Sequence, residues 1–75
     1  MFKLTDGKSE IVLDRVEDLE SILASGKTPK HTTDIYAKTI FGSWYLLWTW
    51  FPDGVRKSNP NPMPEQILIG LIGVL

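Results

Sequence analysis

The chain of 75 residues has no cysteine and a single histidine, and these scarcities exclude whole classes of site. It can form no disulfide and no thiolate metal centre, and one imidazole cannot build a multi-histidine centre. We therefore expect no metal and no cofactor. Folding of so short a chain buries only about 60% of its unfolded surface, so we expect marginal stability without outside contacts. A partner, a second copy or a lipid surface could supply those contacts.

Strong charge of one sign is also missing, because the net charge is −1. Residues 1–25 carry a charge of −3 and residues 26–75 a charge of +2, so the two parts can complement each other within one fold or between copies. Such a small net charge gives no extended positive field. We expect no nucleic-acid partner.

No apolar run is long enough to be a convincing membrane span, which takes about 20 residues. Residues 35–51 come closest, but Lys38, Thr39 and Ser43 interrupt them, and the C-terminal run 67–75 is shorter. The N-terminus has neither the apolar core of a secretory signal nor the arginine-rich pattern of a transit peptide. We expect a cytoplasmic protein, with membrane association as the alternative.

Aromatic residues are concentrated in residues 39–51, TIFGSWYLLWTWF, which hold all three tryptophans and no charge. Residues 34–51 fit either an aromatic-rich second helix with a narrow polar stripe or one long strand. Aromatic and β-branched content favours the strand. Length favours the helix, since strands rarely exceed about ten residues, and the helix is our prediction.

The N-terminal third has clearer signals. Residues 1–13 predict a β-hairpin, because Asp6-Gly7 suits a two-residue turn between alternating segments. Residues 14–25 predict an acidic amphipathic helix, with Asp14 as N-cap and Glu17 completing a capping box. Gly26 is placed to end that helix in the left-handed conformation.

The C-terminal third begins with a turn at Pro52-Asp53-Gly54 and continues into a proline-rich spacer at 58–65. The apolar segment that follows contains Gly70 and Gly73, which disfavour a helix and leave a buried strand as an option. Together these elements predict an α+β fold forming a single small domain over residues 1–75. Its predicted core is Leu4, Ile11, Leu13, Val16, Leu19, Leu23, Ile40, Trp44, Leu47, Trp48, Ile69 and Leu71.

No group of residues predicts catalysis. The sequence at residues 25–28 ends like a phosphate-binding loop but lacks its first glycine. His31 and Asp34 are close in the sequence, which is weak support for a nucleophile and base. The acidic residues of 14–20 are predicted on a helix, unlike the extended loop of a calcium site. We expect a protein that is not an enzyme.

The tryptophans are the strongest functional signal. Tryptophan is enriched at protein–protein hot spots and at membrane interfaces. We expect a non-catalytic interaction module, a small accessory protein that binds a protein partner or itself as an oligomer. Its predicted contact surface is formed by the aromatic residues together with the C-terminal apolar run. The predicted partner-binding residues are Trp44, Trp48, Trp50 and Phe51. The alternative is a small membrane-associated accessory subunit with residues 34–51 in or on the bilayer.

Overall fold

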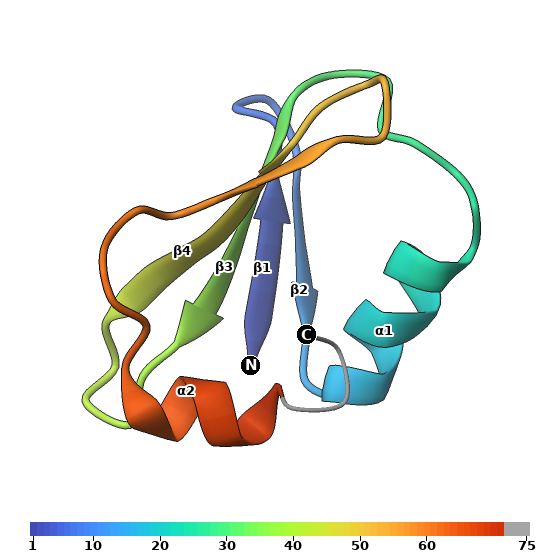
Figure 1. Cartoon of the computed structure of the whole chain (residues 1–75). Coiled ribbons are helices and arrows are strands. Elements are labelled where there is room, and N and C mark those ends of the chain that lie inside the picture. Colours follow the sequence, from blue (N-terminus) through green and yellow to red (C-terminus); the bar gives the residue numbers. More distant parts are fainter. Residues whose placement is uncertain (72–75) are drawn as a thin grey trace.

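The computed structural model describes residues 1–71 and is built on a five-stranded antiparallel sheet (Figure 1). Helix α1 (Val16–Ala24) links the second strand to the third, and α2 (Glu65–Gly70) ends the described chain. The result is a small, compact α+β domain, as the sequence predicted at that level. The strand order is β2-β1-β3-β4-β5, with the strands β1 (Phe2–Thr5), β2 (Glu10–Leu13), β3 (Thr33–Lys38), β4 (Trp44–Trp50) and β5 (Arg56–Ser58).

The first hairpin, β1–β2, lies where the sequence predicted it. Gly7 has a φ of +90°, which glycine adopts without the steric cost that other residues incur. The Asp6 Oδ1 atom accepts hydrogen bonds from the backbone N–H groups of Lys8 (2.9 Å) and Ser9 (2.8 Å). The side chain of Asp6 therefore closes the turn.

Helix α1 also lies where it was predicted, but the expected capping box is wrong. The N-cap residue is Arg15, and no side chain caps the helix. Asp14 falls one residue too early, because β2 runs in extended form to Leu13 and turns only afterwards. The Glu17 carboxylate instead lies 3.4 Å from Arg15 Nε, in an exposed ion pair. Beyond the helix, Gly26 has the predicted positive φ of +77°.

Residues 34–51 are neither one helix nor one long strand. They contain most of the β3–β4 hairpin, so the predicted helix is wrong. The Thr39 N–H donates to the Ser43 carbonyl at 2.7 Å, and the Gly42 N–H donates to the Thr39 carbonyl at 3.0 Å. Gly42 has a φ of +85°, which lets the chain reverse in the middle of the aromatic stretch. Two strands of ordinary length thus replace one that would be unusually long.

A register shift interrupts the β3–β4 ladder. Tyr36 pairs with Leu46 and Ile35 pairs with Trp48, so Leu47 is the extra residue of a β-bulge. Because the bulge breaks the alternation of faces, the consecutive residues Leu47 and Trp48 are both buried.

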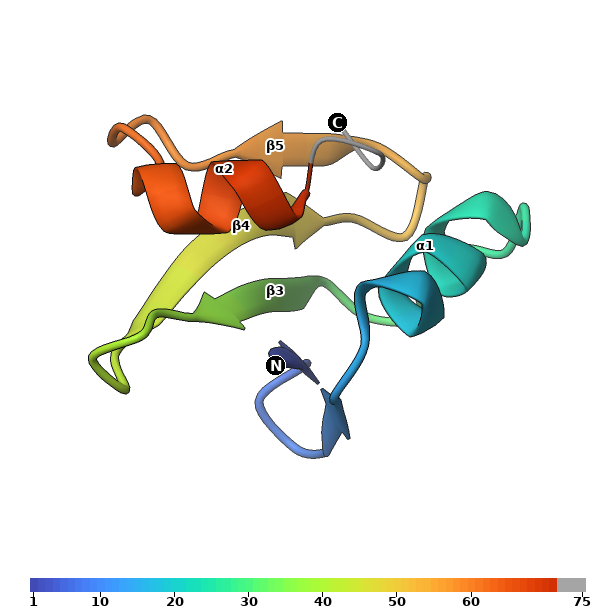
Figure 2. The same ribbon diagram turned by 90° about the horizontal axis from the view of Figure 1, so that it is seen from below.

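The core lies between one face of the sheet and the two helices. Figures 1 and 2 show α1 beside that face and α2 across the lower end of the sheet. No polar or charged residue is buried among residues 1–71. The buried residues are Phe2, Leu4, Leu19, Ile35, Ala37, Leu47, Trp48, Trp50, Ile67 and Leu71.

Four predicted core residues are exposed instead: Ile11, Ile40, Trp44 and Ile69. The other predictions were better, with Leu13, Val16 and Leu23 partly buried against the core. The sequence left a buried strand as an option after the proline-rich spacer. That option is wrong for residues 65–70, which form α2. Residues 72–75 of the same segment lie outside the described residues. Ile67 in this short helix and Leu71, its C-cap residue, are four residues apart and both pack in the core.

Candidate interaction surface

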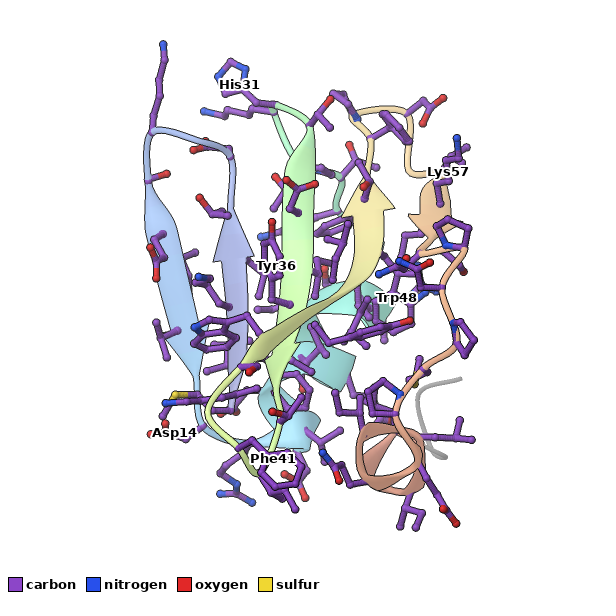
Figure 3. The ribbon with its side chains drawn as sticks, turned by 90° about the vertical axis from the view of Figure 1, so that its left-hand side faces the viewer. Asp14, His31, Tyr36, Phe41, Trp48 and Lys57 are labelled. Carbon is purple, nitrogen blue, oxygen red and sulfur yellow. The ribbon has the colours of Figure 1, made fainter. Side chains whose placement is uncertain are left out.

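The sheet has a second face, here called the outer face, that neither helix covers (Figure 3). The register identifies its central residues, since Lys3 pairs with both Val12 and Tyr36, and Lys38 pairs with Trp44. Directly paired residues lie on the same face of a sheet. The outer face carries Lys3, Thr5, Glu10, Val12, Asp34, Tyr36, Lys38, Trp44, Leu46 and Thr49.

Two lysines and two aromatic rings form a compact cluster on this face, at the end of the β3–β4 ladder next to the turn. Lys3 Nζ lies 5.1 Å from the centre of the Tyr36 ring and 4.5 Å from that of Trp44. Lys38 Nζ lies 5.7 Å from the Trp44 ring. We call these four residues the aromatic–lysine cluster. Each exposed cation–π contact is worth about 0.5–1 kcal/mol, enough to hold the rings and cations in a preferred arrangement.

The hairpin tip, residues 39–43, adjoins the cluster and presents apolar side chains to solvent. Ile40 is 77% exposed and Phe41 is 83% exposed, and Phe41 projects below the strands in Figure 3. The turn is held by its two backbone hydrogen bonds and by a bond of 3.2 Å from the Ser43 N–H to the Thr39 hydroxyl oxygen. These exposed side chains therefore stand on a well-fixed turn.

The four residues predicted to bind a partner do not lie on one surface. Trp44 is on the outer face and 36% exposed, whereas Trp48 and Trp50 are each 7% exposed and lie in the core. Phe51 is half-buried after β4, where its N–H donates to the Val55 carbonyl at 2.9 Å. The bulge at Leu47 explains the division. Without it, the three tryptophans would share one face of the strand.

Sequence reasoning missed Lys3 and Tyr36, which complete the cluster from β1 and β3. Their signal was the alternation in the two strands, where each stands between residues that are buried. The aromatic stretch contains no cation, yet the fold places Lys3 and Lys38 over its first tryptophan. The fold thus supplies, from β1 and from the end of β3, the cations that the aromatic stretch itself lacks.

The two surface pockets contain few polar side chains that could bind or activate a ligand. One, of about 180 Å³, lies between the hairpin tip and α2, and its only polar side chains are Lys38 and Gln66. A second, of about 330 Å³, lies between α1 and the first hairpin and contains Asp6 and Ser9. Hydrogen bonds from the Ser9 and Lys8 backbone hold the pKa of Asp6 below its ordinary value of 3.8. A carboxylate that already accepts hydrogen bonds within its turn and has a lowered pKa is a poor general base at neutral pH.

Residues 1–71 also contain no group of three or more metal-ligating side chains that could hold an ion. Within the same residues, neither helix has the length and apolar character to cross a membrane. Comparisons of the chain with models of protein families, with curated proteins and with solved structures found no match. Its functional interpretation therefore rests on geometry.

Proposed function

We propose that this chain is a non-catalytic interaction module that binds a protein partner, or a second copy, through the β3–β4 hairpin. The contact surface consists of Trp44 on the outer face with Ile40 and Phe41 at the tip. Trp48 and Trp50 lie in the core and are not part of this surface. The observation that carries the proposal is the exposure of two adjacent large apolar side chains, 77% and 83%, on a hydrogen-bonded turn.

The energetics favour contact at the tip. Moving one large apolar side chain out of water is worth about 1.5–3 kcal/mol, and Ile40 and Phe41 are both available for this. Because the turn is already fixed, binding needs little further ordering of the backbone. Trp44 adds an aromatic surface of the kind that often dominates binding energies.

The charges beside these residues suggest the character of the partner. Lys3 and Lys38 flank Trp44, and a rim of this sign favours acidic groups on the partner around an apolar centre. The lysine stems also extend the apolar area next to the ring. The proposed partner thus has an apolar pocket for Phe41 with carboxylates near its edge.

Capture experiments with matched variants test the proposal. The full chain is immobilised and exposed to a lysate of its own organism, and bound proteins are quantified for wild type, Phe41→Ser, Trp44→Ala and Val55→Ser. Val55 is 56% exposed outside the proposed surface, so its variant controls for a general loss of apolar area. We expect a specific protein to be retained by wild type and Val55→Ser but to fall at least tenfold with the other two variants.

The second-copy version has its own readout. Sedimentation velocity of the same four proteins would show an oligomer that Phe41→Ser and Trp44→Ala dissociate and Val55→Ser preserves. If neither capture nor self-association distinguishes the variants, the hairpin is not a contact surface and the proposal fails.

A second candidate is peripheral contact with a membrane, and the same tip favours it. Ile40 and Phe41 could enter the headgroup region while Lys38 remains near anionic lipid. Flotation with vesicles of phosphatidylcholine and phosphatidylserine tests this candidate. Binding lost with Phe41→Ser but kept with Val55→Ser would support it, and a protein that never floats would reject it.

A further inference from the structure

Within residues 1–71, the edge of β2 is the most prominent unpaired feature outside the hairpin tip. β2 forms one margin of the sheet, and Figure 3 shows no ribbon beyond it. The strand has no proline, lysine or bulge to discourage pairing, and Glu10 is its one charged residue. The opposite margin, β5, does carry such residues, with Arg56 and Lys57 in the strand and Pro60 soon after. Among the strands of residues 1–71, β2 is therefore the margin that discourages a further strand least.

The hydrogen-bond pattern shows which groups on β2 are free. The Asp6 N–H donates to the Ser9 carbonyl at 3.3 Å, so these two residues are a hydrogen-bonded pair of the ladder. Because such pairs alternate in an antiparallel hairpin, Ile11 bonds to β1, and Glu10 and Val12 direct their N–H and C=O groups away from it.

Counting from the other side of β1 gives the same result. The Lys38 N–H donates to the Met1 carbonyl at 3.0 Å, so Met1 and Lys3 direct their backbone groups toward β3. Phe2 and Leu4 must then bond toward β2, in agreement with the count from the turn. The outward direction of the Glu10 and Val12 groups therefore rests on two independent bonds.

We propose that β2 pairs antiparallel with β2 of a second copy, about a two-fold axis centred on Ile11. In this register Glu10 lies opposite Val12 of the other copy, and each such pair exchanges both of its hydrogen bonds. The two Ile11 side chains meet across the axis as a non-hydrogen-bonded pair, in which side chains approach most closely. Ile11 is 55% exposed and Val12 is 51% exposed in the single chain, so both have surface to bury.

Charge distinguishes this register from its neighbours. An axis centred on Val12 would place Glu10 opposite Asp14, and an axis centred on Glu10 would place that carboxylate opposite itself. Like charges directly opposite each other destabilise a strand pair. The axis at Ile11 avoids both conflicts and also brings Lys8 opposite Asp14. An axis centred on Leu13 would place β2 opposite residues 13–16 of the other copy, which lead into α1, and not opposite its β2.

The geometry favours a second copy over an unrelated segment, because the strand complements itself in hydrogen bonds, apolar side chains and charge. The strand has only four residues, so we expect a weak dimer that forms at high concentration. The inference is independent of the proposed function, since the β2 edge shares no residue with the hairpin surface.

Single-cysteine variants test the register directly, because the natural chain has no thiol. Ile11→Cys would place two thiols across the axis at a separation that suits a disulfide. Val12→Cys and Val55→Cys are matched controls, with parent side chains 51% and 56% exposed. Under mild oxidation we expect covalent dimer to form at least tenfold faster with Ile11→Cys than with either control.

Equal rates for the three variants would overturn the proposal, and this is also the result expected if the edge binds a segment of another protein. Faster cross-linking of Val12→Cys would overturn the register.

A blocking substitution provides a second test that preserves the fold. Val12→Pro removes an N–H that points outward, so the β1–β2 ladder keeps its bonds. Added to Ile11→Cys, it should reduce the cross-linking rate at least tenfold while the far-ultraviolet circular dichroism spectrum stays unchanged. Lys8→Glu should also slow the reaction, and Asp14→Lys in the same chain should restore it. A cross-linking rate that stays the same after these substitutions would contradict the proposed pairing of β2 with β2.

Discussion

One residue, Leu47, decides how the aromatic stretch is used. Its place in the bulge moves Trp48 and Trp50 to the core side of β4 and leaves Trp44 on the outer face. The sequence does not reveal the bulge, because Leu47 stands in a continuous apolar run in which every position suits a strand. The three tryptophans were predicted to act together because tryptophan is enriched at protein–protein hot spots, and that enrichment does not say which face each one occupies.

Asp6 provides a prediction at the residue scale. Hydrogen bonds from the Ser9 and Lys8 backbone stabilise its carboxylate and hold its pKa below 3.8. Since the folded pKa lies below the unfolded value, this stabilisation is present above about pH 3.8 and disappears as the pH falls through the folded pKa. NMR titration of the Asp6 carboxyl carbon should give a midpoint below 3.8, and a midpoint at or above it would mean that the turn bonds are absent.

At the scale of elements, prediction succeeded where the signal was local. The β1–β2 hairpin was recognised from Asp6-Gly7 and α1 from its apolar spacing, because turn chemistry and periodicity act within a few residues. The β3–β4 hairpin was missed because Gly42 and Ser43 stand between large apolar residues, Phe41 and Trp44, and not in a cluster of polar turn residues. Helix α2 was missed because six residues are too few for periodicity to show.

Gly42 provides a prediction for the second hairpin. Its φ of +85° is strained for any residue with a Cβ, while an added Cβ would meet only Lys38 Cε, at 4.0 Å. Gly42→Ala should therefore lower the free energy of unfolding by about 1–2 kcal/mol through the backbone alone. Gly42→Asn should lose less, because asparagine tolerates this conformation better. Urea unfolding measures both, and an alanine variant as stable as the wild type would contradict the turn geometry.

For the whole molecule, the sequence predicted a small α+β domain, but not the aromatic–lysine cluster. That cluster includes Lys3 from β1, Tyr36 from β3 and Trp44 from β4, and strand pairing brings them together. Non-local pairing of this kind leaves little trace in local sequence patterns. Composition still indicated correctly that the chain has more aromatic residues than its core contains.

The central claim is that the fold divides this aromatic stretch, with Trp48 in the core and Trp44 on the outer face. Urea unfolding of Trp44→Ala and Trp48→Ala tests it most directly. Trp48 is 7% exposed, so its loss should cost about 3–5 kcal/mol or abolish the cooperative transition. Trp44 is 36% exposed and mainly loses its contacts with Lys3 and Lys38, so its loss should cost about 1 kcal/mol. Equal losses for the two variants would contradict the account.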